Sequence, residues 1–375
     1  MAKKVKNVNI LKKGSGDIII LVVTAILVAL GLIMVLSASS PSSLSESGDS
    51  YAYFRKQLLA TGAGIAALLF FYTVDYNVWR KMKWIIYVGA VGLLFLVGVM
   101  GLSAGGATRW INIAGFNFQP SEVSKVAFVL FFASILTDLK EHKIINKWKG
   151  FVFPMALLVL PVIAIFIVQN HFSATLIIVA ITVVQMFVAG VNLKWFILIA
   201  MGGIGAIAAL ALGGSFRSTR IQTWLNPFSD PTGEGWQIIQ SLYAIGSGGI
   251  FGAGLGESKQ KYLYLPEPQN DFIFSVLAEE LGFFGCIVVI ILFLIFIWRG
   301  IVIAMNAKDT YGCLVAIGIV ALIGLQALIN IAVVTGTIPV TGMPLPFFSY
   351  GGTAILTNLA AVGLLLNISK TSVKK

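Results

Sequence analysis

Charge is scarce in this sequence. Asp, Glu, Lys and Arg together make up 11% of the 375 residues, whereas a soluble domain of this length carries about a quarter charged residues. Hydrophobic residues reach 58%, and the shortage of charge extends over the whole length. The composition therefore excludes an ordinary soluble domain and predicts an integral membrane protein.

Cysteine and histidine are rare as well, with two residues of each type. Cys286 and Cys313 fall in apolar runs and form neither a CxxC nor a zinc spacing, so we expect them to be small buried hydrophobic residues. His142 lies in a lysine-rich segment and His171 at a tight turn, and neither has Cys, Asp or Glu at metal-ligand spacing. The sequence therefore predicts no disulfide framework and no metal site built from histidines.

Acidic residues are outnumbered by Lys and Arg, 15 to 26, which gives a formal net charge of +11. The cations lie between apolar runs rather than on one helical face. This distribution is typical of the cytoplasmic loops of a membrane protein. It argues against a nucleic-acid partner.

Ten apolar runs have the length of about 20 residues that a spanning helix needs. The first could be mistaken for a signal peptide, but its apolar run is too long, so we expect it to be retained. The ten runs lie near residues 17–38, 57–75, 82–101, 121–137, 151–169, 172–190, 194–213, 272–297, 310–334 and 352–368. The predicted fold class is an all-α polytopic membrane protein with ten transmembrane helices. One membrane domain (17–368) would lie between a basic tail (1–16) and a short tail (369–375).

Most of the Lys and Arg residues fall in the two tails and in alternate loops, which predicts that both termini are cytoplasmic. The loop between helices 7 and 8, residues 214–270, is then large and external. Within it, Trp236, Ile239, Leu242 and Tyr243 recur at helical spacing, as expected for a half-helix at the membrane interface. The glycine-rich run 246–256 matches no nucleotide-binding motif and predicts a closely packed re-entrant turn.

Asp271 is the leading catalytic candidate. It ends the polar stretch YLPEPQNDFIF (264–274), in which prolines flank Glu267, and it stands directly before an apolar helix. One interpretation is a helix cap. The other is a general base, whose pKa the apolar residues 272–274 would raise toward the working pH and a nearby arginine would lower.

Polar residues in or beside other spans are also informative, because each is costly in a bilayer unless it is paired or hydrated. Pro120 and Glu122 are typical of a helix start, and Lys125 lies one turn deeper on the face of Glu122, so a Glu–Lys pair lining a wet cavity is expected, with Arg109 nearby. Glu279 and Glu280 cannot share one helical face. We expect one to pair with a cation such as Lys125 and the other to cap a kink or meet water.

The uncharged segment 335–354, TGTIPVTGMPLPFFSYGGTA, contains prolines and glycines that break helix geometry. It is suited to shape a pore or a lid. Thr341, Ser349 and Tyr350 within it are able to hydrogen-bond a sugar, although a rigid turn alone also explains them.

Four segments carry a resemblance to a known family: RWINIAGFNFQPSE, LNPFSDPTGEGWQIIQSLYAIGSGGIFGAGLG, YLPEPQNDFIFSVLAEELGFFG and GMPLPFFSYGG. They are similar to those of the SEDS proteins (shape, elongation, division and sporulation), typified by FtsW, RodA and SpoVE. The resemblance covers essentially the whole chain, and PEPQNDFIF is closer to the FtsW and SpoVE branch. Two departures stand out. Gln169-Asn170-His171 replaces the usual Gln-Pro-Asp after the fifth span, and Thr337 replaces an aliphatic residue.

The resemblance implies a peptidoglycan glycosyltransferase of the bacterial cell membrane, at the septum or the spore envelope. It would polymerise lipid II into a growing glycan strand beside a class B penicillin-binding protein and other division or sporulation membrane proteins. The family's essential acid falls on Asp271. The only cofactor that we consider is a divalent cation, Mg²⁺ or Mn²⁺, bridging the pyrophosphate. The expected substrate-binding residues are Arg109, Glu122, Lys125, Arg217, Arg220, Glu267, Glu279, Glu280, Ser349 and Tyr350.

Two alternatives remain open at this point. A lipid II flippase would need a polar lining through the full depth of the membrane, and Glu279, Glu280 and Lys125 would matter more than Asp271. A scaffold that only recruits the transpeptidase would need none of the charged residues at the ends of the spans.

Overall fold

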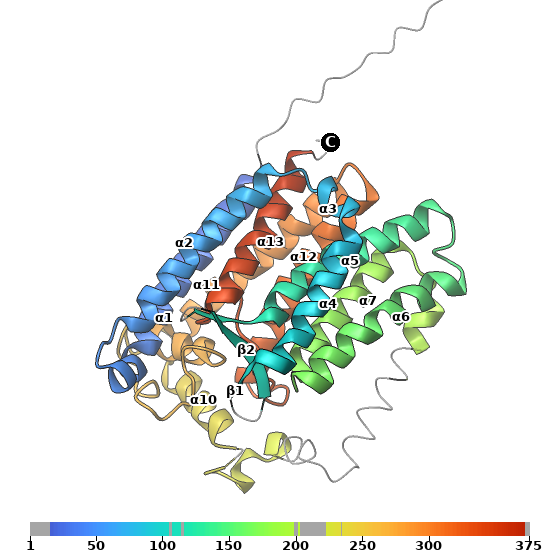
Figure 1. Cartoon of the computed structure of the whole chain (residues 1–375). Helices are drawn as coiled ribbons and strands as arrows, with labels where there is room; N and C mark the ends of the chain where they lie inside the picture. The colour runs from blue at the N-terminus through green and yellow to red at the C-terminus, as the bar shows by residue number, and fades with distance from the viewer. Residues whose placement is uncertain are drawn as a thin grey trace, which may run out of the picture.

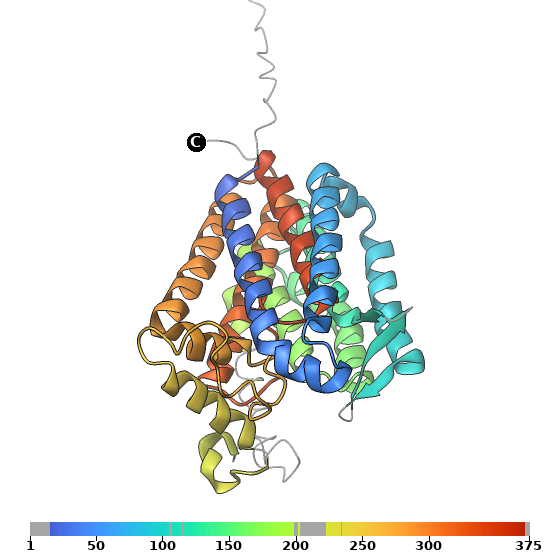
Figure 2. The same ribbon diagram turned by 90° about the vertical axis from the view of Figure 1, so that its left-hand side faces the viewer.

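The computed structural model describes residues 16–104, 107–113, 116–198, 202, 223–233 and 235–371. Most of these residues form one bundle of long helices (Figures 1 and 2). Eight helical segments are long and apolar enough to cross a membrane: α1 (Ile18–Ser47), α2 (Ala52–Thr73), α4 (Lys83–Met100), α6 with its π-helical end (Trp148–Val168), α7 (Phe172–Ala189), α11 (Ile273–Met305), α12 (Thr310–Val334) and α13 (Gly352–Lys370). A multi-pass membrane protein is therefore confirmed, and the predicted seventh span, 194–213, lies mostly outside the described residues.

The fourth predicted span is α5 (Pro120–Glu141), which begins with proline in its first turn as expected. It is not among the eight apolar segments, and it is almost entirely buried. It packs against α4, α7, α12 and α13. Because protein rather than lipid surrounds this helix, its polar side chains line the interior of the bundle.

Close helix packing depends on small residues, as is usual in membrane bundles. The most extensive helix pair joins α2 and α13. A Cβ atom at Gly363 would lie only 2.4 Å from the carbonyl oxygen of Leu68, so glycine is required where these two backbones approach. This pair places the start of α13 beside the start of α2.

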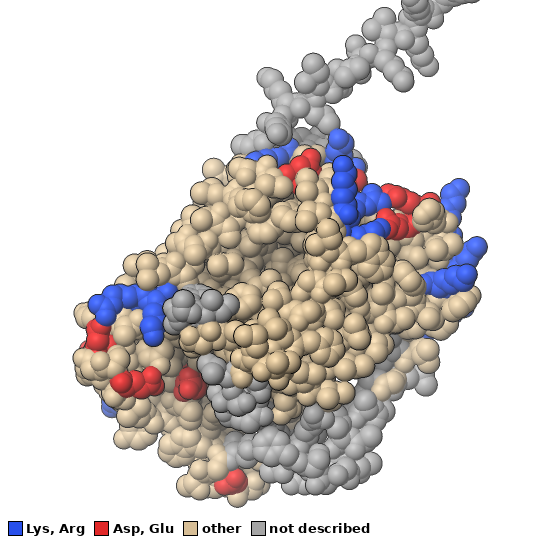
Figure 3. All heavy atoms as spheres, in the orientation of Figure 1, with Lys and Arg blue, Asp and Glu red and all other residues tan. Residues whose placement is uncertain are grey.

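The beginning of α1 and the end of α13 lie at the same end of the bundle. The backbone N–H of Asp17 donates to Ser369 Oγ at 2.9 Å, and Asp17 forms an ion pair with Arg299. Figure 3 shows charged side chains near this end and a smaller group toward the opposite end, with a broad uncharged belt between them. That belt has the character expected of a surface in contact with lipid.

The opposite end differs from the sequence prediction in two ways. First, α1 continues to Ser47 instead of ending near residue 38. Second, three short antiparallel strands follow α4, so the fold is not purely helical: β1 (Leu102–Ala104), β2 (Ala107–Ile113) and β3 (Phe116–Phe118) in the order β1-β2-β3. Helix α3 (Asn77–Lys81) and the 3-10 turn Pro227–Ser229 are further short elements.

The predicted half-helix is present as α10 (Trp236–Ser247), at the same end as the strands (Figure 1). The glycine-rich run after it packs against a break in α11 at Gly282, whose φ is 67°. There the carbonyls of Glu279 and Glu280 accept from the N–H groups of Ala253 and Gly254. A Cβ at Gly252 would lie 2.1 Å from the carbonyl oxygen of Glu280, which confirms the close packing predicted for this run.

Candidate active site

A cavity of about 750 Å³ lies where the first turns of several helices converge. Its lining comes from the start of α2, from β2, from the first turns of α5 and α7, from the approach to α11 and from the segment that precedes α13. Helix N-termini carry partial positive charge, so their convergence favours an anionic ligand. The sequence-predicted residues in the lining are Arg109, Glu122, Lys125, Glu267, Asp271 and Tyr350.

Asp271 is held by its backbone. Its carbonyl accepts a hydrogen bond of 2.8 Å from Asn330 Nδ2, which also donates to the carbonyl of Met343 at 2.6 Å. Asn330 therefore joins α12, the approach to α11 and the segment before α13 at one point. The N-cap position of α11 is Phe272, without a side-chain cap, so the capping interpretation of Asp271 is wrong. None of the residues that the structure describes donates a hydrogen bond to the Asp271 carboxylate.

The surroundings of Asp271 favour its protonated form. Burial is the largest cause and raises the pKa of this carboxyl to about 6. The charge of Glu267 raises the pKa further, and Arg109 opposes both effects. The sequence predicted that an arginine would lower this pKa. Burial and Glu267 together outweigh Arg109, so the pKa of Asp271 is raised. A carboxylate of this kind is suited to take up a proton near neutral pH.

Glu122 and Lys125 form the predicted pair in the first turns of α5. Lys125 Nζ lies 2.7 Å from Glu122 Oε1, and the two side chains are 2% and 4% exposed. Both line the cavity. The pairing satisfies two charges that would otherwise be isolated inside the bundle.

Arg109 reaches the cavity from β2, an element that the sequence did not predict. Its guanidinium donates to the carbonyl of Asn170 at 2.9 Å, immediately before α7. The next residue, His171, also lines the cavity and is 7% exposed. Burial, followed by the charges of Arg109 and Lys125, lowers the pKa of His171 to about 3 and keeps its imidazole neutral.

His171 was not among the residues predicted for the site. A signal was present, because this histidine stands where the family usually has an acid. Tyr53 and Lys56 at the start of α2 also line the cavity, and no sequence motif identified them. Helix α2 begins at Ala52, whereas the predicted span begins near residue 57, so both residues fell outside the predicted helix.

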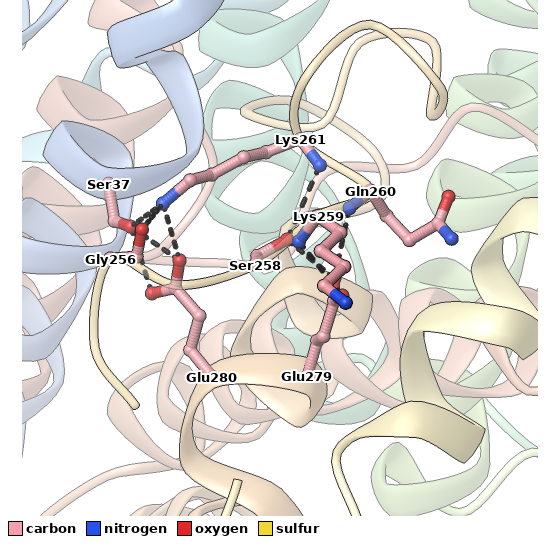
Figure 4. Close-up of polar contacts among 8 residues, drawn as sticks. All are labelled: Ser37, Gly256, Ser258, Lys259, Gln260, Lys261, Glu279 and Glu280. Carbon is pink, nitrogen blue, oxygen red and sulfur yellow. Dashed lines mark hydrogen bonds and ion pairs between the residues drawn. The ribbon is translucent and has the colours of Figure 1, made fainter. Parts of the chain in front are cut away.

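Glu279 and Glu280 lie outside the cavity lining, so their assignment to substrate binding is not supported, and neither of them pairs with Lys125. Figure 4 shows Glu280 beside Lys261 and Ser37. Lys261 Nζ lies 2.8 Å from Glu280 Oε1, and these side chains are 3% and 0% exposed. The Ser37 hydroxyl donates to the same carboxylate at 2.6 Å.

Glu279 anchors the same loop from the other side. Its carboxylate accepts hydrogen bonds from the Ser258 hydroxyl and from the backbone N–H groups of Lys259 and Gln260 (Figure 4). The two acids therefore stand directly before the kink at Gly282. A position at a kink was one of the predictions for this acidic pair. Their role is to fasten the loop that leads to Asp271.

Ser349 does not line the cavity either. Its hydroxyl donates to the carbonyl of Asn270 at 2.6 Å and accepts from the N–H of Leu345 at 2.8 Å. The N–H of Tyr350 donates to the carbonyl of Gln269 at 2.8 Å. The non-helical segment before α13 thus supports the backbone that carries Asp271. The remaining predicted residues, Arg217 and Arg220, lie outside the described part of the chain.

The fold and the site define a class of protein: a helical multi-pass membrane protein with a charged cavity at one end of its bundle. The chain belongs to the FtsW/RodA/SpoVE family of cell cycle proteins, whose family model matches residues 17–374. It is 44% identical to stage V sporulation protein E of Bacillus subtilis (strain 168), over 96% of this chain and 99% of that protein. It is 41% identical to a probable peptidoglycan glycosyltransferase FtsW of Geobacter sp. (strain M18), over 94% of this chain and 96% of that one.

Solved structures show the same fold. One is a chain from a study described as "Structural coordination of polymerization and crosslinking by a peptidoglycan synthase complex", with a TM-score of 0.77, 26% identity and coverage of 94% of this chain and 97% of that one. Another is the rod shape determining protein RodA of Thermus thermophilus, with a TM-score of 0.71, 24% identity and coverage of 96% and 98%. The second similarity concerns the fold alone.

Proposed function

We propose that this protein is a peptidoglycan glycosyltransferase that polymerises lipid II, with Asp271 as its general base. The observation that carries the proposal is a carboxylate of raised pKa facing a cavity that also holds Arg109 and Lys125. The identity to proteins named peptidoglycan glycosyltransferase over nearly the whole chain gives the reaction class.

In the proposed reaction, Asp271 accepts the proton of the 4-hydroxyl of the acceptor GlcNAc. The hydroxyl oxygen forms a bond to the anomeric carbon of the donor MurNAc, and the bond from that carbon to the undecaprenyl pyrophosphate breaks with inversion. The pyrophosphate leaves without protonation because cations offset its charge. Arg109 and Lys125 are the described candidates for this task, and Arg217 and Arg220 are candidates outside the described residues.

A divalent ion would fit this scheme as an aid to the leaving group. In the described part of the chain no three metal-ligating side chains come together. A Mg²⁺ or Mn²⁺ ion would therefore be held chiefly by the oxygens of the pyrophosphate, as Mg²⁺ often is.

The proposed topology has ten transmembrane helices, both termini in the cytoplasm and a large outer loop over 214–270. The shared position of the start of α1 and the end of α13 supports an even number of crossings. The Lys and Arg residues of the two tails and alternate loops support a cytoplasmic location for that end. The cavity then opens at the outer face, where the polymer is needed.

The proposed partners are a class B penicillin-binding protein and other division or sporulation membrane proteins. The similarity to a chain of a peptidoglycan synthase complex that couples polymerization to crosslinking supports the first of them. The similarity to a sporulation protein and to FtsW proteins supports a location at the septum or the spore envelope.

A polymerisation assay tests the proposal. Purified protein in lipid nanodiscs with lipid II, with and without its penicillin-binding protein, is expected to yield glycan strands, seen on gels after enzymatic labelling. The same protein in sealed vesicles tests the flippase alternative, through the exposure of headgroups on the far leaflet. Translocation without polymer would replace the proposal with a flippase, and the absence of both activities with the partner present would favour a scaffold.

The rate of polymerisation should depend on the ionisation of Asp271. With a pKa of about 6, this carboxyl is ionised above that pH and protonated below it, so the rate should rise with pH and level off above 6. On the acidic side it should fall about tenfold per pH unit. In Glu267→Gln the inflection should move to lower pH, because the charge of Glu267 helps to raise the pKa of Asp271. An unchanged inflection in this variant would contradict the assignment.

A further inference from the structure

The cavity has two ends of different chemistry. At one end Arg109 and Lys125 lie close enough to His171 to lower its pKa. At the other end, burial and the neighbouring Glu46 raise the pKa of Glu267 and of Tyr350. Asp271 lines the same cavity, and its pKa is raised by Glu267 and lowered by Arg109.

Two tyrosines form the wall of the acidic end. The rings of Tyr53 and Tyr350 meet edge to face, with centroids 4.8 Å apart and an interplanar angle of 87°. Tyr53 comes from the first turn of α2, and its hydroxyl donates to Glu46 Oε2 at 2.5 Å. The backbone of Tyr350 is bonded to Gln269, two residues before Asp271. Both rings line the cavity and are only half-buried, so part of each is available to a ligand.

Glu267 stands beside this pair with a fixed orientation. Its Oε2 accepts hydrogen bonds from Asn270 Nδ2 at 2.7 Å and from Gln269 Nε2 at 3.3 Å. No described residue donates to its Oε1, which leaves one acceptor for a ligand hydroxyl. The φ of Glu267 is 50°, an uncommon value for a residue other than glycine, and such positions often serve a binding or catalytic role.

Aromatic rings beside a carboxylate suit a sugar. A pyranose has apolar C–H faces that pack on aromatic rings and hydroxyls at its edge that donate to carboxylates. Glu46 and Glu267 repel a phosphate here, and Lys56, one turn along α2 from Tyr53, offsets only part of their charge. The other end of the cavity, with its cations, is the place for phosphate.

We propose that Tyr53, Tyr350 and Glu267 form the subsite that holds the acceptor sugar, an N-acetylated hexosamine. This inference rests on the proposed function. Displacement with inversion requires the attacking hydroxyl and the leaving pyrophosphate on opposite sides of the anomeric carbon. With the pyrophosphate at the cations, the acceptor approaches from the tyrosines. Asp271 lines the cavity two residues after the backbone contact of Tyr350 with Gln269, and it meets the hydroxyl of the acceptor.

The test is the binding of N,N′-diacetylchitobiose, which presents the GlcNAc 4-hydroxyl and carries no pyrophosphate. Saturation-transfer NMR on protein in nanodiscs reports this binding without turnover. Wild type and Asp271→Asn are both expected to bind the disaccharide. Tyr53→Leu and Tyr350→Leu should each bind it more weakly by about tenfold, the value of an aromatic contact.

Two matched variants separate ring contact from loop structure. Tyr53→Phe keeps the ring and loses the hydrogen bond to Glu46, and it should bind nearly as wild type does. Tyr51→Leu removes an exposed tyrosine that does not line the cavity and should also bind normally. Wild-type affinity in both cavity leucine variants would overturn the inference, as would equal losses in Tyr53→Phe and Tyr53→Leu.

Failure of the subsite and failure of the proposed function give different results. Sugar binding that depends on the tyrosines, in a protein that forms no polymer, would leave the saccharide subsite in place and remove the polymerase function. Polymer formation together with sugar binding that is unchanged in the tyrosine variants would support the polymerase function and remove the saccharide subsite.

Discussion

Asp271→Asn is expected to abolish the formation of glycan strands from purified lipid II. An asparagine has the same shape as aspartate but cannot accept the proton of the attacking hydroxyl. General-base catalysis contributes about 10²- to 10⁴-fold to a rate, so the loss should be at least about a hundredfold in a polymerisation time course. The backbone bond from Asn330 to residue 271 does not depend on the side chain, and the local fold should survive.

Stability provides the control for this variant. The raised pKa of Asp271 means that its ionised form is disfavoured in the folded protein. Above pH 6 a neutral amide should therefore unfold at no lower temperature than wild type, and it should still bind the penicillin-binding protein. A drop in thermal midpoint would attribute lost activity to misfolding. Full polymerisation by the asparagine variant would remove Asp271 from the role of base.

Much of the fold is predictable from the sequence because membrane helices have a strong signal. Runs of about 20 apolar residues identify the spans without tertiary information. The misses have physical causes. The end of α1 is built from serines, which are common in loops, and here it extends to Ser47, where Gly48 in the left-handed conformation ends the helix. Strands β1 and β3 have three residues each, too few for a period of two, and β2 lacks a regular alternation of apolar and polar residues. The three strands form by pairing with one another.

The site was predictable where sequence neighbours interact. Glu122 and Lys125 are three residues apart on one helix, so their pair follows from helical geometry. The partner of Glu280 was not predictable, because Lys261 lies on a loop whose path depends on the break at Gly282. The contact between the rings of Tyr53 and Tyr350 was not predictable either, because the two residues are far apart in the sequence.

The second large effect concerns the buried ion pair. Lys261→Met is expected to destabilise the protein by about 3–5 kcal/mol, the usual cost of leaving one charge of a buried pair without its partner. The lysine also donates to Ser37 and to the carbonyl of Gly256, so three elements lose a common contact. The change should appear as a lower midpoint in thermal unfolding of the detergent-solubilised protein. Lys259→Met is the matched control, because this neighbouring lysine is exposed and should leave the midpoint unchanged.

A double variant separates the cost of the orphaned charge from the value of the pair. Lys261→Met combined with Glu280→Leu removes both charges, and replacing a buried pair by apolar residues is often neutral or stabilising. The double variant should therefore unfold at a higher temperature than Lys261→Met alone. A midpoint as low as that of the single variant would show that the geometry of the loop requires the ion pair itself. In that case polymerisation should fall together with stability, because the loop held at Glu279 and Glu280 is the one that carries Asp271 to the cavity.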